Sequence, residues 1–178
     1  MNLDKFLWSK TKVDILKYLL FRRQWVSMRA LESELSRTFP SIKKQIDSLE
    51  ESDVVLVNKQ NMKWSIAIKP EIINVIKWIF MYSLIAELEK LFFTHSFLIE
   101  KYFFGKFFWR ELEIDLVIIH QTTEKTFWDK LKDEISQIFK NYFIDNISMT
   151  LMSSTEREKR QRLADKFVLN ILRSQSQK

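Results

Sequence analysis

This chain of 178 residues has no cysteine, two histidines and a single glycine, Gly105. Without cysteine it can form neither disulfides nor thiolate metal sites, which fits a reducing cytoplasm. Average usage would place roughly 12 glycines in a chain of this length. Dinucleotide-binding and P-loop sequences need several glycines at fixed spacing, so one glycine excludes both. It also disfavours an all-β protein with many tight turns, so the sequence predicts a helix-rich protein in which Gly105 has a specific role.

Long apolar runs are missing as well. The most apolar stretch, residues 72–93, contains Asn74, Lys77, Glu87, Glu89 and Lys90, which makes it a poor membrane span. The first residues lack the apolar core and the small-residue cleavage site of a secretory signal. His95 and His120 are too few for a histidine-rich metal site, and we interpret each as a surface or half-buried polar residue. We therefore expect a cytoplasmic protein with no membrane partner, no metal and no bound cofactor.

The net charge of +6 is unevenly distributed along the chain. Residues 1–70 hold 13 Lys and Arg against 8 Asp and Glu, whereas residues 71–178 hold 16 against 15. A basic excess in the first segment is typical of a nucleic-acid contact, and a solvated surface is the alternative explanation.

Three helices and a hairpin are predicted in residues 1–69. Apolar residues recur at helical spacing over residues 12–21. Ser27 is a suitable N-cap for a helix over 28–35, and Thr38 for a helix that has Pro40 in its first turn and runs to about Glu51. The strand-like runs 54–57 and 64–68 are joined by polar residues, which predicts a hairpin.

This order of elements, with the run from Glu32 to Val55, resembles winged helix-turn-helix domains of the ArsR/MarR type. The resemblance implies that the third helix enters the major groove of DNA and that the hairpin is the wing. Asp53 stands where the family usually has glycine, which predicts a left-handed backbone conformation there. The residues placed to contact DNA bases or phosphates are Ser41, Lys43, Lys44 and Gln45 of the third helix and Lys59, Asn61 and Lys63 of the wing. A winged helix that binds protein instead of DNA is the alternative.

A long helix is predicted to follow Pro70, because nothing interrupts it over residues 71–93. Its apolar residues cover more than one face. One face can pack on its own domain while another meets a second copy in a homodimer, which would suit a palindromic DNA site. The alternative is a central helix buried within one chain. The predicted domains are residues 1–69, a connecting or dimerisation helix over 70–93, and residues 94–178.

The remaining residues predict a small mixed sheet with helices, so the whole chain belongs to the α+β class. Strand-like runs cover residues 97–104, 112–119 and 146–152. An amphipathic helix over 124–142 has Thr122 and Thr123 as candidate caps, and a terminal helix is predicted over 155–173.

This second segment resembles the minimal nucleotidyltransferase fold of the DNA polymerase β superfamily over about residues 94–153. The aromatic run Tyr102-Phe103-Phe104, then Gly105, then Glu113-Ile114-Asp115 carry the resemblance. It implies that the glycine lets the backbone approach a triphosphate and that carboxylates on one side of a strand share Mg²⁺ ions.

Three departures from that pattern predict a domain without catalytic activity. Lys106 replaces the usual serine, Glu113 replaces the first aspartate, and Ser148 falls where the third aspartate is expected. The remnant of the nucleotide site would consist of Gly105, Lys106, Glu113 and Asp115. This remnant either binds a nucleotide or phosphate effector or is filled by Phe107, Phe108 and Trp109.

Together these patterns predict a dimeric transcriptional regulator that binds double-stranded DNA. Its second domain, a pseudoenzyme, would serve assembly or effector sensing. The alternatives are an active Mg-dependent nucleotidyltransferase and an antitoxin-like partner protein.

Overall fold

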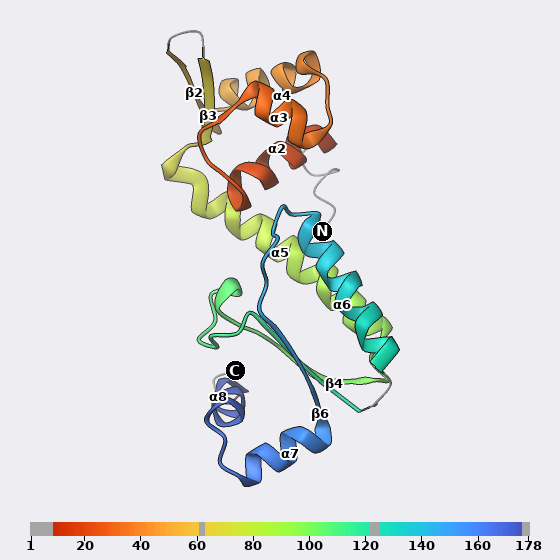
Figure 1. The fold of residues 1–178 in the computed structure, drawn as a ribbon. Coiled ribbons are helices and arrows are strands. Elements are labelled where there is room, and N and C mark those ends of the chain that lie inside the picture. The colour runs from red at the N-terminus through yellow and green to blue at the C-terminus, as the bar shows by residue number, and fades with distance from the viewer. Residues whose placement is uncertain (1–8, 61–62, 122–124, 176–178) are drawn as a thin grey trace. The chain divides into compact units, whose positions relative to one another are not determined.

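The computed structural model describes residues 9–60, 63–121 and 125–175. These residues form α-helices and two three-stranded sheets, so the fold is α+β (Figure 1). The chain divides into two compact units. The first unit comprises residues 1–86 together with 139–144, and the second comprises residues 87–138 and 145–178.

The first unit contains three helices close to their predicted positions: α2 (Lys10–Phe21), α3 (Met28–Leu35) and α4 (Phe39–Glu51). Ser27 caps α3 as predicted, because its Oγ accepts a hydrogen bond from the Ala30 amide at 3.2 Å. Ser36 ends α3 in the left-handed conformation and starts the turn into α4. The apolar face of α4 consists of Ile42, Ile46 and Leu49, all buried.

The prediction that Thr38 caps α4 with its side chain is wrong. Thr38 has the extended backbone of an N-cap residue, but its side chain makes no capping hydrogen bond. The Phe39 amide donates instead to Glu32 Oε1 at 3.0 Å, so a carboxylate of α3 satisfies the first exposed amide of α4. Asp53, after α4, has a φ of 61°, which confirms the predicted left-handed residue, and its carboxylate pairs with Lys69.

An antiparallel sheet completes this part of the first unit. Its strands are β1 (Val26–Ser27), β2 (Val55–Gln60) and β3 (Lys63–Ile68), in the order β1-β3-β2. The β2–β3 register runs from Val55↔Ile68 to Gln60↔Lys63. The sequence did not predict β1, because two residues between helices carry no periodicity.

Helix α5 (Pro70–Thr94) is continuous, as the sequence predicts. Its residues up to Ala86 group with the first unit and those from Glu87 with the second. Phe80, Met81 and Leu84 are buried in the first unit. Within the described ranges, no helix combines the length and apolar character needed to cross a membrane.

A short segment from much later in the chain, Phe139–Ile144, also belongs to the first unit. Tyr142 is fully buried, and its hydroxyl hydrogen-bonds Ser83 Oγ of α5 at 3.1 Å. Lys17 Nζ lies 3.8 Å from the centroid of the Tyr142 ring, and Phe21 meets that ring edge-on. Phe143 packs edge-on against Tyr18, so this segment covers α2 with an aromatic cluster.

The second unit is built on β4 (Ile99–Phe104), β5 (Leu116–His120) and β6 (Met149–Ser153). The central strand β5 pairs antiparallel with β4 and parallel with β6, and all its residues are buried. Helix α6 (Lys125–Lys140) lies in the connection that parallel pairing requires. His120 is buried at the end of β5 and stacks on Trp128 of α6, whereas the sequence predicted a surface or half-buried polar residue.

The predicted terminal helix over 155–173 is wrong, because two helices stand in its place: α7 (Ser154–Arg162) and α8 (Lys166–Gln175). Ala164 between them has a φ of 51°, and Asp165 Oδ1 accepts from the Phe167 amide at 2.8 Å to start a new helix. Helix α7 is held to the sheet by Glu100, which binds Ser154 and Arg157. The Ser154 hydrogen bond is the main reason that the pKa of Glu100 falls below its usual value.

Replacing Tyr142 will test whether the inserted segment holds the first unit together. We expect Tyr142→Ala to lower the free energy of unfolding by about 3–5 kcal/mol, because it leaves a cavity in the core. Tyr142→Phe, which removes only the hydrogen bond to Ser83, should cost about 1 kcal/mol.

Phe97→Ala is the matched control for Tyr142→Ala, because Phe97 is 70% exposed and the truncation of its side chain should cost less than about 0.5 kcal/mol. Urea denaturation followed by circular dichroism measures all three variants. An unchanged midpoint for Tyr142→Ala would contradict the anchoring role.

Candidate functional site

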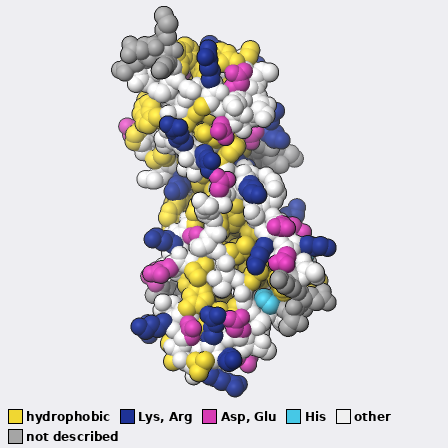
Figure 2. Space-filling model, viewed as in Figure 1, with side chains coloured by type: hydrophobic (Ala, Val, Ile, Leu, Met, Phe, Trp, Pro, Cys, Tyr) yellow, Lys and Arg dark blue, Asp and Glu magenta, His cyan; other side chains and the backbone are white. Residues whose placement is uncertain are grey.

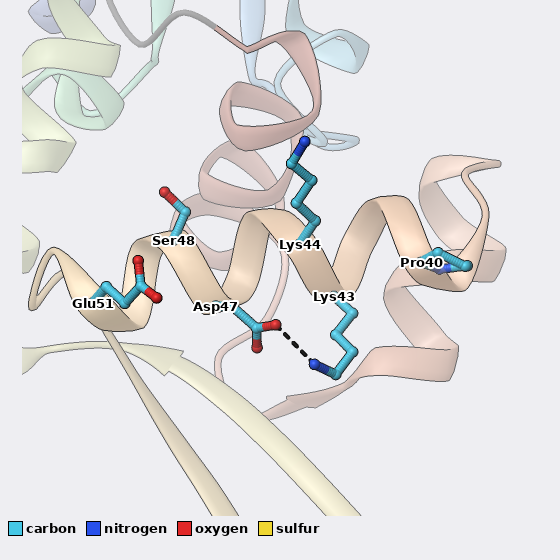
Figure 3. Close-up of a pocket in the computed structure, with 6 residues that line it drawn as sticks. All are labelled: Pro40, Lys43, Lys44, Asp47, Ser48 and Glu51. Atoms are coloured by element: carbon cyan, nitrogen blue, oxygen red, sulfur yellow. Dashed lines mark hydrogen bonds and ion pairs between the residues drawn. The ribbon is translucent and has the colours of Figure 1, made fainter.

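The outward side of α4 forms an open groove opposite its buried face (Figure 3). The residues that line it are Pro40, Lys43, Lys44, Asp47, Ser48 and Glu51. The spacing of these residues follows the helical repeat, which places them away from Ile42, Ile46 and Leu49. Two residues predicted to contact DNA, Lys43 and Lys44, are therefore among the residues that line this groove.

Lys43 is not a free cation. Its Nζ lies 2.8 Å from Asp47 Oδ2, one turn further along α4. The same Nζ is 6.0 Å from the centroid of the Trp64 ring on β3. Asp47 therefore orients Lys43 and offsets its charge.

Lys59 of β2 is also held near Trp64. It pairs with Trp64 across the hairpin, and its Nζ lies 5.0 Å from the ring centroid. Its Nζ is also 3.5 Å from Glu50 Oε2 of α4. Lys59 and Trp64 thus fasten the hairpin to α4, which the sequence prediction did not include.

Lys44 differs from both lysines. It is exposed, and it forms no ion pair with the residues that the structure describes. Figure 3 shows its side chain directed away from the Lys43–Asp47 pair. Of the α4 residues in the groove, Lys44 is the one best placed to reach a phosphate.

The other predicted DNA contacts vary in position. Ser41 and Gln45 are half-buried on α4. Lys63 begins β3, where its backbone pairs with Gln60. Asn61 lies outside the described residues. Ser48, in the groove, accepts a hydrogen bond from Lys12 of α2 at 2.7 Å, which ties α2 to α4.

The charges in the groove balance. Lys43 and Lys44 are opposed by Asp47 and Glu51. In Figure 2, acidic side chains are likewise interspersed with basic ones on the face in view. The groove therefore offers a donor and acceptor pattern with little net positive charge.

Position 105 in the second unit requires glycine, because the backbone of residues 112–114 passes directly beside it. Its φ of −116° is open to any residue, so a left-handed turn is not the reason for glycine. A Cβ at this position would lie 1.7 Å from the Ile114 carbonyl oxygen. The Gly105 amide donates to the Asp115 carbonyl at 2.8 Å, and the Lys106 amide donates to the Leu112 carbonyl at 2.7 Å. Residues 112–114 thus occupy the space directly beside the glycine.

The carboxylate of Asp115 is surrounded by hydrogen-bond donors. It accepts from the Phe107 amide at 3.0 Å, from the Ser148 amide at 3.0 Å and from Ser148 Oγ at 2.8 Å. The Asp115 amide in turn donates to Ser148 Oγ at 3.0 Å. Asp115 therefore joins the turn after β4 to the start of β6.

Glu113 and Asp115 do not share one side of a strand. The predicted strand over 112–119 starts only at Leu116, because residues 112–115 bend across Gly105. Glu113 and Lys106 are both exposed. Lys106 begins a short 3₁₀ helix, Lys106–Phe108, in which Phe108 is buried, while Trp109 after it is 46% exposed.

The predicted remnant site is thus brought together only in part. Gly105, Asp115 and Ser148 meet around one turn, whereas Glu113 points to solvent. Within the ranges that the structure describes, no three His, Asp or Glu side chains cluster closely enough to hold a metal ion.

Comparisons of the chain with family models, with curated protein sequences and with solved structures gave no match.

Two carboxyl substitutions will test the role of Asp115. We expect Asp115→Ala to lower the free energy of unfolding by at least about 1.5 kcal/mol, because a charged acceptor of three hydrogen bonds is lost. Glu113→Ala should change it by less than about 0.5 kcal/mol, since its side chain is exposed. Thermal unfolding of the two variants measures the difference. Equal stability would show that the Asp115 hydrogen bonds do not hold the turn.

Proposed function

We propose that the chain is a transcriptional regulator that binds double-stranded DNA through a winged helix-turn-helix in its first unit. The observation that carries the proposal is the element order α2-β1-α3-α4-β2-β3 with the antiparallel sheet order β1-β3-β2. A left-handed residue turns the chain from α3 into α4, and the β2–β3 hairpin is fastened beside α4. In this arrangement α4 is the recognition helix and the hairpin is the wing.

The second unit has no enzymatic role in this proposal. It is a nucleotidyltransferase-like domain that serves assembly or effector sensing. The engaged carboxylate of Asp115 and the chain crossing at Gly105 support this role. Both features use the residues of the nucleotide-site pattern to hold the turn after β4 in place.

DNA binding can be tested with random duplex DNA and the full chain. We expect retardation in a gel at low salt and an affinity that falls steeply as the salt concentration rises. Lys44→Ala should weaken binding to all sequences and reduce the slope of log affinity against log salt by about one.

Lys132→Ala is the matched control, because Lys132 is an exposed lysine of α6 in the second unit. This variant should bind DNA like the unmodified protein. Failure of the unmodified protein to retard any duplex at low salt would refute the proposed function.

We further propose that the regulator is a homodimer formed through α5. Val75, Trp78 and Tyr82 lie on one face of this helix and are 61%, 64% and 62% exposed. Large apolar side chains grouped on a surface mark interaction sites. A second copy of α5 would cover this face symmetrically and would give the two recognition helices that a palindromic site requires.

Charges introduced on this face will test the dimer. The unmodified chain should sediment as a dimer, and the double variant Val75→Glu/Tyr82→Glu as a monomer, because each new carboxylate would lose its water in the interface. Phe97→Glu is the control: Phe97 is 70% exposed but lies outside α5, so this variant should stay dimeric. A monomeric unmodified protein at micromolar concentration would exclude the α5 dimer and leave the DNA-binding proposal standing.

A further inference from the structure

We infer that the Lys43–Asp47 ion pair recognises a G·C base pair in the major groove of DNA. This inference rests on the proposed DNA-binding function and adds the base preference of the site. Its starting point is the 2.8 Å contact between Lys43 Nζ and Asp47 Oδ2 in the α4 groove.

The groove is poorly suited to bind phosphate alone. Its two lysines are balanced by Asp47 and Glu51, so its surface has little net attraction for the phosphate backbone. An aspartate that enters the groove of DNA also loses water, and it needs a hydrogen-bond donor in exchange. Phosphates offer no donor, whereas the amino groups of bases do.

The pair presents a cationic donor beside an anionic acceptor. A G·C pair displays the complementary pattern at its major-groove edge: guanine N7 and O6 accept, and cytosine N4 beside them donates. The Lys43 ammonium would bind guanine, and the Asp47 carboxylate would accept from the cytosine amino group. An A·T pair gives the ammonium fewer acceptors on one base and places the thymine methyl group nearby.

The surroundings of the pair keep it in place. Lys43 Nζ lies 6.0 Å from the centroid of the Trp64 ring, on the side of the wing. Glu50, another carboxylate of α4, is engaged by Lys59, whose Nζ lies 3.5 Å from Glu50 Oε2. Lys43 is therefore oriented by Asp47 before DNA arrives, which reduces the entropy lost on binding.

The inference predicts a base preference that depends on Asp47. The chain of residues 1–178 is used to select duplexes from a randomised pool, and the bound DNA is sequenced. The unmodified protein should enrich G·C at one position of each half-site by about tenfold over A·T. Asp47→Asn should lose this preference and bind random duplex more tightly, because one negative charge is gone.

Two further variants make the result specific. Lys43→Gln breaks the same pair from the other side and should also lose the G·C preference, but with weaker binding to random duplex. Glu34→Gln removes a negative charge from an exposed side chain of α3, outside the groove, and should keep the preference.

The outcomes separate this inference from the function on which it rests. Binding without a base preference, enrichment of A·T, or a G·C preference that survives in Asp47→Asn would each overturn the inference and leave DNA binding intact. An absence of any selected duplex would overturn the DNA-binding function itself, and the inference with it.

Discussion

The first unit depends on one buried side chain that comes from outside its own stretch of sequence. Tyr142 fills a position between α2 and α5, where it binds Ser83, Lys17 and Phe21. The chain therefore leaves the first unit after residue 86, returns at residue 139 and leaves again after residue 144. Closing a loop of that length costs entropy that the aromatic contacts must offset. Residues 139–144, which follow α6 in the sequence, thus complete the packing of the three helices and their sheet.

The second unit is organised by a comparable constraint at Gly105. The backbone of residues 112–114 passes so close that no side chain fits there, and Asp115 fastens the same turn to Ser148. The glycine and the aspartate thus support one another: the glycine allows the crossing, and the carboxylate holds it. Both residues belong to the pattern that resembles a nucleotidyltransferase. Their hydrogen bonds explain on structural grounds why such residues stand here, whichever function the unit has.

Local signals in the sequence predicted most of the helices and strands, but they did not predict contacts between residues far apart in the sequence. The spacing of Ile42, Ile46 and Leu49 identified the buried face of α4, and Asp53 was recognised as left-handed. The cap of α4 was missed because Glu32, on another helix, supplies it. The sequence did not predict the break before α8, because Asp165 fits the helical pattern around it. The structure shows that the Asp165 side chain instead accepts a hydrogen bond from the Phe167 amide and caps a new helix. In the candidate site, periodicity placed Lys43 and Lys44 on one helix, but the ion pair of Lys59 with Glu50 depends on the register of the hairpin.

The position of α4 links the proposed DNA binding to the rest of the chain. Ser48 of α4 is held by Lys12 of α2, and α2 is covered by Tyr142 and Phe143. These two aromatic residues lie in the connection between α6 and β6. Coupling of this kind needs contiguous packed contacts, which Lys12, Lys17, Tyr18 and the aromatic cluster supply. In the proposed sensing role, an effector bound to the second unit would act on the groove by altering how residues 139–144 pack on α2.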